Sequence, residues 1–167
     1  EQLVFRVMPR EVIVDEVGVG SGTIVEQELA RRLHAASIAQ VTIDDEGVLP
    51  EGGDADAFTA RLDQLPVDVI GLNCATGPAE MGEHLRHLSQ HARMPISCLP
   101  NAGLPRNEGG KAVYDLTPTE LARWHERFVN EYGVNLIGGC CGTTPAHIQA
   151  VAERLHGVSP GRKRRES

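Results

Sequence analysis

The stretch Val134–Ile148 reads VNLIGGCCGTTPAHI and joins the end of one expected element to the start of the next. VNLIG is short, apolar and β-branched, which is typical of a buried strand. Thr144-Pro145 is a typical helix start, because proline is favoured at the first helical position. A buried strand that leads through a glycine-rich loop into a helix is the repeating unit of parallel α/β proteins.

The same strand-then-helix pattern occurs three more times before this stretch. The predicted strands are Ser37–Ile43, Val67–Asn73 and Pro95–Leu99, and the predicted helices after them are Asp54–Leu65, Pro78–His91 and Thr117–Gly133. The third helix is the clearest, because Thr117 and Glu120 form a capping box and Gly133 is a natural stop. Four such units predict a parallel sheet with right-handed crossovers.

The first 36 residues fit this pattern less well. Glu11–Val19 is a candidate strand and Ile24–Ala36 a candidate helix, with the glycine-rich segment Gly18–Gly22 between them. That segment lacks the G-x-G-x-x-G spacing of dinucleotide-binding proteins, so we interpret it as a flexible turn.

Composition and charge exclude several classes of protein. The net charge of −7 argues against a nucleic-acid binder, which carries a basic face. No apolar run reaches the roughly 18 residues that suggest a membrane span, and the N-terminus lacks the pattern of a signal peptide. The chain has four cysteines but no need of disulfides at this size, so we expect a reducing, cytoplasmic setting. Because the chain starts at Glu1 and not at Met, we expect a fragment or a processed product.

Unusual residues follow the ends of three predicted strands. They are Asn73-Cys74, the segment Pro100–Gly103, and the pair Cys140-Cys141. The carboxyl ends of parallel strands meet at one edge of the sheet, where α/β proteins build their active sites. We therefore expect Cys74 to lie near Cys140 and Cys141 in space.

The adjacent cysteines allow three interpretations: small buried residues, a redox pair, or metal ligands. A disulfide between neighbours distorts the backbone, which argues against the redox pair. Three thiolates at one edge match a catalytic zinc site with an open fourth position, so we favour metal over simple burial. Cys98 lies inside a predicted strand and is expected to be a buried apolar residue. His84, His87 and His91 are interpreted as the solvated face of a helix.

Three motifs carry a resemblance to a known family: GLNCATGPAEM (Gly71–Met81), PNAGLP (Pro100–Pro105) and LIGGCCGTTPAHI (Leu136–Ile148). They closely resemble the homocysteine-binding domain of cobalamin-dependent methionine synthases, which belongs to the zinc-dependent homocysteine S-methyltransferases. The resemblance covers about Ile38–Leu155, the C-terminal half of that domain. Ile38–Gly47 also looks like the bifunctional enzymes that join this domain to a methylenetetrahydrofolate reductase.

The resemblance implies an α/β fold that is part of a (β/α)8 TIM barrel, here with about four to five βα units and parallel strands. It implies that Cys74, Cys140 and Cys141 bind Zn²⁺, with no catalytic residue beyond this zinc site. It also puts Asn73 and Asn101 at the substrate end of the barrel as candidate substrate-binding residues. For Asn101, a turn-forming role is the alternative.

The resemblance further implies a methyltransferase reaction. The zinc-bound thiolate of L-homocysteine attacks a methyl donor and gives methionine. The donor is methylcobalamin or another methyl carrier, supplied by a separate cobalamin- or folate-binding module.

A complete barrel needs around 250 residues, so the resemblance implies that this chain holds only part of one. By how well they match the family, its residues fall into three segments. They are a poorly matched N-terminal segment (1–36), the C-terminal half of the barrel (37–157) and a basic tail or linker (158–167). Glu16 is the one candidate for the acidic residue that the family's N-terminal half supplies. Open sheet edges lead us to expect a homo-oligomer or association with the missing half. The alternative is a truncated zinc-binding module or subunit without turnover, or part of the bifunctional enzyme.

Overall fold

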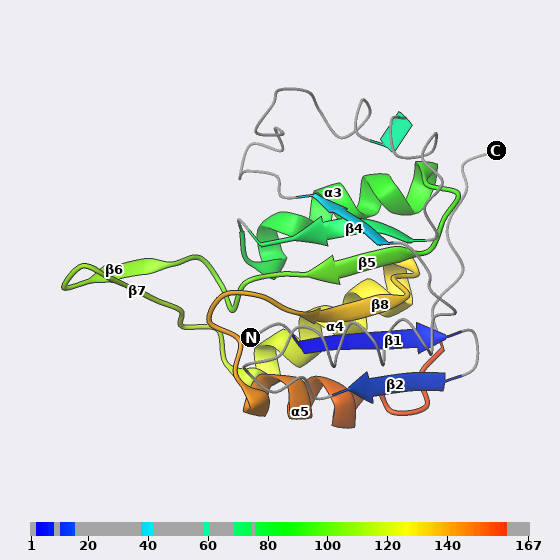
Figure 1. The fold of residues 1–167 in the computed structure, drawn as a ribbon. Helices are drawn as coiled ribbons and strands as arrows, with labels where there is room; N and C mark the ends of the chain where they lie inside the picture. The colour runs from blue at the N-terminus through cyan, green and yellow to red at the C-terminus, as the bar shows by residue number, and fades with distance from the viewer. Residues whose placement is uncertain are drawn as a thin grey trace.

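A mixed six-stranded sheet with three helices on one face organises the protein (Figure 1). The computed structural model describes residues 3–8, 11–15, 38–41, 59–60, 69–74 and 76–159. The strand order is β2-β1-β8-β5-β4-β3. These strands are β1 (Leu3–Met8), β2 (Glu11–Asp15), β3 (Ile38–Val41), β4 (Val69–Asn73), β5 (Ile96–Leu99) and β8 (Leu136–Gly139).

Strands β3, β4, β5 and β8 are parallel to one another, which confirms the four predicted strands and their direction. The pairing of Ile70 with Ile96, and of Cys98 with Ile137, sets the register of the central three. The carboxyl ends of these strands therefore share one edge of the sheet. The loops that follow β4, β5 and β8 start from that edge.

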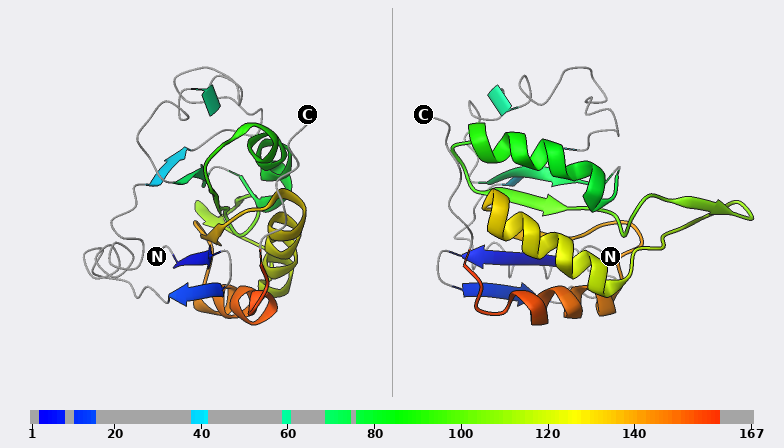
Figure 2. Two further views of the ribbon diagram at one scale, coloured as in Figure 1. Left: turned by 90° about the vertical axis from the view of Figure 1, so that its right-hand side faces the viewer. Right: turned by 180° about the vertical axis from the view of Figure 1, so that it is seen from behind.

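Helices α3 (Pro78–His91), α4 (Pro118–Tyr132) and α5 (Pro145–Leu155) cover one face of the sheet (Figure 2). The predicted capping box is present at α4, where the Thr117 N–H donates to Glu120 at 2.8 Å. The helix ends at Gly133, whose φ of 64° is the left-handed conformation that glycine favours. None of the helices described is long and apolar enough to span a bilayer.

The core lies between these helices and the sheet. Its largest fully buried side chains come from all three helices and from β4, β5 and β8: Ile70, Leu72, Met81, Leu85, Leu88, Ile96, Leu121, Phe128, Ile137, Ile148 and Leu155. Cys98 belongs to this core, as predicted, with its Sγ 4.0 Å from the Met81 sulfur. Burial raises the pKa of the Cys98 thiol, so this cysteine stays protonated and apolar.

The N-terminal part of the sheet differs from the expectation of parallel strands. β1 pairs antiparallel with both β2 and β8. Only Pro9 and Arg10 separate β1 from β2, and so short a link joins antiparallel strands only, because a parallel pair needs a crossover. β1 was not anticipated, and the predicted strand at Glu11–Val19 is observed as β2.

Apart from Thr59 and Ala60, which are helical, the predicted helix at Asp54–Leu65 lies outside the described residues.

Three other expectations also lie outside the described residues: the helix at Ile24–Ala36, the turn at Gly18–Gly22 and most of the basic tail.

A second feature that was not anticipated is the hairpin of β6 (Arg106–Glu108) and β7 (Lys111–Val113). Its two-residue turn is Gly109-Gly110, with φ of 58° and 84°. Positive φ at both turn positions is the type I′ geometry that suits two-residue hairpins. The hairpin projects away from the body at the carboxyl edge of the parallel strands (Figure 1).

His125 connects α4 to β8, and we expect it to make stability dependent on pH. Its Nε2–H donates to the Gly138 carbonyl at 2.7 Å, and burial lowers its pKa from 6.5 to about 4. Between these values the unfolded chain binds a proton that the folded chain does not. The free energy of unfolding should therefore fall as pH drops from 6.5 to 4, by up to about 3 kcal/mol.

Urea unfolding at several pH values, with chelator and reductant present, measures this loss. The variant His125→Gln keeps an N–H donor but cannot titrate, so its stability should change less over the same window. An equal pH dependence in the variant and the wild type would contradict this role for His125.

Candidate metal centre

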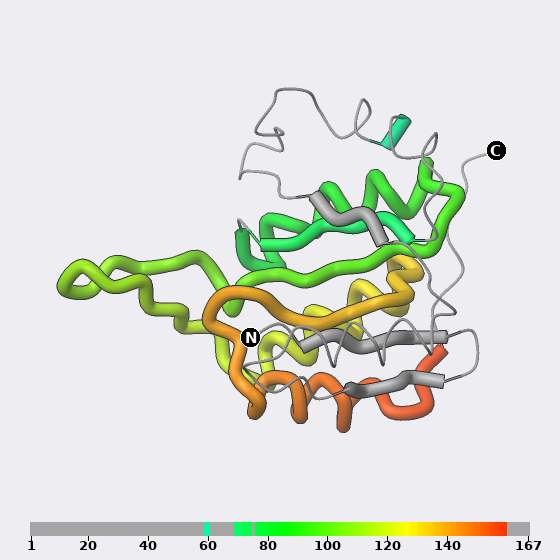
Figure 3. Tube along the Cα trace, viewed as in Figure 1, coloured from blue at the N-terminus to red at the C-terminus, as the bar shows by residue number. Residues whose placement is uncertain are grey.

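Three thiols meet at the carboxyl edge of the parallel strands. Cys74 follows β4, and Cys140 and Cys141 follow β8, where the chain turns toward α5 (Figure 3). Their Sγ atoms all lie within 4.8 Å of one another. The Cys74 and Cys141 sulfurs are 3.6 Å apart, and those of Cys140 and Cys141 are 4.0 Å apart. The structure thus brings together the three cysteines that the sequence analysis grouped.

This spacing fits a metal ion with tetrahedral coordination. Zinc–thiolate bonds of about 2.3 Å put neighbouring sulfurs roughly 3.8 Å apart in a tetrahedron. The two sulfur–sulfur distances lie on either side of that value. Thiolates are soft ligands that suit zinc and a few other transition metals. The cluster therefore has the donor atoms and the spacing to hold one metal ion, with a fourth position left for another ligand.

The last residue of β5 and the loop that follows it hold both cysteine-bearing loops through backbone hydrogen bonds. These run from Cys74 N to Leu99 O (3.0 Å), from Cys140 N to Pro100 O (2.8 Å) and from Ala102 N to Cys141 O (2.9 Å). β5 lies between β4 and β8 in the sheet, so its exit loop passes between the other two.

Asn101 adds a side-chain contact to this arrangement. Its Oδ1 accepts a hydrogen bond from the Cys141 N–H at 3.1 Å, and its own N–H donates to Thr76 O at 3.1 Å. Asn101 is 3% exposed, so these bonds are shielded from water. The Asn101 amide oxygen therefore faces the backbone of a thiol-bearing loop. Asn73 is the half-buried last residue of β4, directly before Cys74.

The backbone at the thiols adopts conformations that few residues tolerate. Cys74 has a φ of 58°, the one positive value among non-glycine residues in the described part of the chain. Such a conformation costs on the order of 1–3 kcal/mol and is typically found at functional sites. Gly139 is needed for close approach, because a Cβ there would lie 2.2 Å from Thr143 Oγ1. The glycines beside the cysteine pair thus allow the chain to turn tightly after β8.

The Cys140 thiol disfavours ionisation in the absence of a cation. Burial, together with the neighbouring Cys74 and Cys141, raises the pKa of Cys140 to about 12. Cys140 and Cys74 are half-buried, whereas Cys141 is exposed. A divalent cation would supply the positive charge that makes three adjacent thiolates stable.

Tyr114 is a neighbour of the thiols that the sequence analysis missed. Burial, together with the nearby Cys141, Cys74 and Cys140, raises the pKa of the Tyr114 hydroxyl. A Cβ at Gly142, where φ is 77°, would lie 2.3 Å from Tyr114 Cγ, so the ring packs directly on that glycine. The dipeptide Gly109-Gly110 could have indicated a two-residue hairpin in the sequence. Such a hairpin returns the residues that follow it to the carboxyl edge of the sheet.

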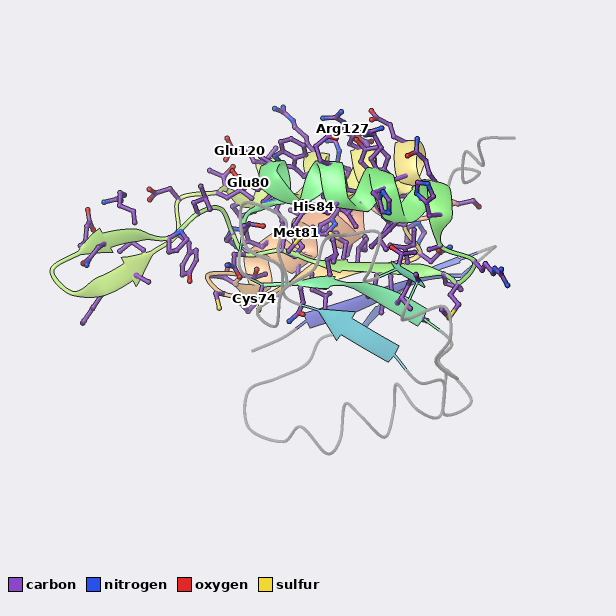
Figure 4. All side chains as sticks on the ribbon, turned by 90° about the horizontal axis from the view of Figure 1, so that it is seen from above. Cys74, Glu80, Met81, His84, Glu120 and Arg127 are labelled. Atoms are coloured by element: carbon purple, nitrogen blue, oxygen red, sulfur yellow. The ribbon has the colours of Figure 1, made fainter. Side chains whose placement is uncertain are left out.

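The histidines of α3 do not join a metal cluster. Within the part of the chain that the structure describes, the cysteine trio is the one group of three or more potential ligands that converges. The rings of His87 and His91 stack on each other at 4.2 Å. Glu16 lies outside the described residues. Figure 4 shows Cys74 beside the end of β4, at the edge from which the hairpin projects, whereas His84 lies on the helix above the sheet.

Comparison with known proteins adds independent evidence. The Homocysteine S-methyltransferase family matches residues 20–155, most of the chain. The chain belongs to this family. The methionine synthase of Mycobacterium tuberculosis is 54% identical over 125 residues, and that of Mycobacterium leprae is 53% identical over 128 residues. These alignments cover 75% and 77% of the chain.

Solved structures of this homocysteine S-methyltransferase family have a similar fold. The homocysteine methyltransferase MmuM from Escherichia coli matches in its apo form with a TM-score of 0.55 and 27% identity, over 78% of this chain. Its oxidized form matches with a TM-score of 0.52 and 28% identity, over 76% of this chain. The mixed α/β architecture with parallel strands is thus shared with a solved member of the family.

The chain is much shorter than these relatives. The match spans 10% and 11% of the two mycobacterial methionine synthases. It spans 43% and 39% of the two MmuM chains.

Asn101 offers a test of how the thiol-bearing loops are held. In Asn101→Ala the Cys141 N–H loses its acceptor, and an unsatisfied buried donor costs about 1–3 kcal/mol. The free energy of unfolding should fall by that amount, as measured with urea. Asn107→Ala is the matched control, since Asn107 Oδ1 accepts from Gly110 N (2.9 Å) in the exposed hairpin turn. If the free energy of unfolding falls by the same small amount in both variants, Asn101 is not a structural link between the loops.

Proposed function

We propose that this chain forms part of a methionine synthase-type homocysteine S-methyltransferase, an enzyme that transfers a methyl group to the sulfur of L-homocysteine and gives methionine. The observation that carries the proposal is the cluster of three thiols within 4.8 Å at the carboxyl edge of a parallel sheet. Membership of the Homocysteine S-methyltransferase family supports it. A cluster of this kind is suited to a sulfur substrate, because a soft metal site accepts a further thiolate.

Cys74, Cys140 and Cys141 would hold Zn²⁺ through their Sγ atoms. When bound, zinc would supply the positive charge that lowers the pKa of a substrate thiol into the neutral range. Each cysteine must lose its proton to bind the metal, so zinc affinity should rise with pH. Cys141 is the exposed member of the trio, and the substrate would therefore approach from its side.

The protein's own residues would orient the substrate and the ligands. Asn101 would fix the Cys141 backbone through the bond to its N–H, and Asn73 would lie beside Cys74 at the substrate end. Orientation matters for this reaction, since methyl transfer to sulfur gains rate from alignment of the two reacting atoms.

The parallel strands β3, β4, β5 and β8 would correspond to the C-terminal half of a (β/α)8 barrel, with residues 37–157 as that half. The described residues contain four parallel strands, fewer than the eight of a complete barrel, so a second copy or another chain segment would complete it. The methyl donor would be methylcobalamin or another carrier on a separate cobalamin- or folate-binding module. The reduced thiols would suit a cytoplasmic setting.

The zinc assignment can be tested with four matched variants. Wild type should bind about one zinc per chain, and Cys74→Ala, Cys140→Ala and Cys141→Ala should each lose most of it. Cys98→Ala is the control, because this cysteine is buried in the core and should not affect metal content. Elemental analysis after dialysis measures the ratio of zinc to protein. Full zinc content in the Cys140 variant, or equal loss in the Cys98 variant, would refute the assignment.

The substrate can be tested by calorimetry on the zinc-loaded protein. Homocysteine should bind and release about one proton near pH 7, because its thiol ionises on binding. Titrations in buffers of different ionisation enthalpy count that proton. Homoserine carries a hydroxyl in place of the thiol and should not bind. Equal binding of both would show that sulfur is not recognised.

Formation of methionine with methylcobalamin as donor then distinguishes an enzyme from a zinc-binding module without turnover. Binding of homocysteine with no methionine formed would favour the module.

A further inference from the structure

His147 is a buried histidine in the first turn of α5, shortly after the cysteine pair, and is 7% exposed. Its Nδ1 lies 3.2 Å from the Thr144 backbone nitrogen and 2.8 Å from the Thr144 hydroxyl oxygen. Its Nε2 lies 2.7 Å from the carbonyl oxygen of Leu116. Both ring nitrogens therefore have a hydrogen-bond partner, as is usual for a buried polar side chain.

These partners determine which nitrogen of His147 carries the proton. A backbone N–H can only donate, so Nδ1 accepts the hydrogen bond from Thr144. A carbonyl oxygen can only accept, so Nε2 is protonated and donates to Leu116. At the N-cap of α5, His147 thus takes the place that Glu or Gln has in a capping box. Its second nitrogen remains available to bind another segment.

That second segment is Leu116, between the β6–β7 hairpin and α4, and it is linked in turn to the cysteine pair. The Leu116 N–H donates to the Ala102 carbonyl at 3.1 Å, and the Ala102 N–H donates to the Cys141 carbonyl at 2.9 Å. Thr144 follows Cys141 closely in the chain, so these contacts form a closed set that begins and ends on the segment after β8. The imidazole of His147 is the side chain that completes it.

We propose that His147 is a positioning residue for the metal centre: its bond to the Leu116 carbonyl holds the β5 exit loop against the backbone of Cys141. The inference rests on the proposed binding of zinc by the three cysteines. A metal requires the sulfurs at a defined spacing, roughly 3.8 Å for zinc. A segment that is already held in this geometry loses less conformational freedom when the metal binds, so its affinity is higher.

Capping of α5 alone is the simpler role for His147, and the two roles depend on different nitrogens. The variants His147→Gln and His147→Glu have the same shape, and both can accept a hydrogen bond from the Thr144 N–H. Gln also has an N–H that can donate to Leu116, whereas a carboxylate has none. If His147 only capped the helix, Glu would serve at least as well as Gln, because a negative charge is favoured at a helix N-terminus.

Zinc affinity, measured by competition with a chelator at pH 7, distinguishes the two roles. We expect His147→Gln to bind zinc nearly as tightly as wild type and His147→Glu to bind it about tenfold more weakly. An added carboxylate attracts a cation, so its charge cannot explain a loss of affinity. Gln149→Glu is the matched control, because it adds the same charge to an exposed position of α5 and should leave zinc affinity unchanged.

The visible absorption of bound Co²⁺ reports the geometry of the sulfur ligands, which a change in helix stability alone would not alter. With Co²⁺ in place of zinc, His147→Gln should keep the wild-type spectrum. His147→Glu should absorb more weakly, because its sulfurs depart from a tetrahedral arrangement.

The protonation of His147 can also be measured in the wild type, without relying on a variant. Nitrogen-15 spectra of the imidazoles should show the His147 proton on Nε2, and the signals that disappear in His147→Gln identify this residue. A proton on Nδ1 would overturn the proposal, because Leu116 would then have no donor.

The remaining outcomes separate this inference from the proposed function. A wild type that binds zinc, with the Gln and Glu variants equal to each other in affinity and spectrum, would overturn the role of His147 and leave the zinc site intact. A wild type that binds no zinc would overturn the proposed function itself.

Discussion

The hydrogen bond from the Cys141 N–H to the Asn101 side chain joins the loop after β8 to the loop after β5, and so fixes the thiols relative to the sheet. β4 and β8 are not neighbours in the sheet, because β5 lies between them. A residue that leaves β5 can therefore contact the loops on both sides, and Asn101 does so through its Oδ1 and its N–H. Because Asn101 is buried, each lost partner would cost the desolvation of the group left behind. The spacing of the thiols depends on this small set of bonds.

The fold offsets the unfavourable energy of the site. Cys74 holds a positive φ, at a cost of roughly 1–3 kcal/mol, and three thiols stand close together. Burial of one large aliphatic or aromatic side chain contributes about 1.5–3 kcal/mol. Phe128, Leu121 and Ile148 are three of the many such residues packed between the helices and the sheet, so the cost at Cys74 is about the size of the contribution from one of them. The strained backbone of Cys74 follows the end of β4 and lies outside the core, so it does not disturb the packing of the core.

Local signals explain which parts of the fold could be predicted. The four parallel strands are short apolar runs, and α4 carries its own start and stop in Thr117 and Gly133, so each could be recognised without its neighbours. The pairing of β1 with β8 joins residues at opposite ends of the chain, and no local pattern encodes it. The three cysteines could be grouped because strand ends share an edge. Tyr114 could not, since its contact with Gly142, beside the cysteine pair, depends on where a hairpin folds back.

The fold also explains why three of the four cysteines, and not the fourth, meet in the cluster. All four cysteines of the chain lie in its described part, and Cys98 is the one that does not join the cluster. Its side chain is fully buried inside β5, with the thiol against Met81 and its pKa raised by burial. To reach the cluster it would have to leave the core and give up that packing. The chain therefore provides three thiols and no fourth. A metal bound by these three thiols alone would have a position for one further ligand, which is typical of catalytic zinc sites.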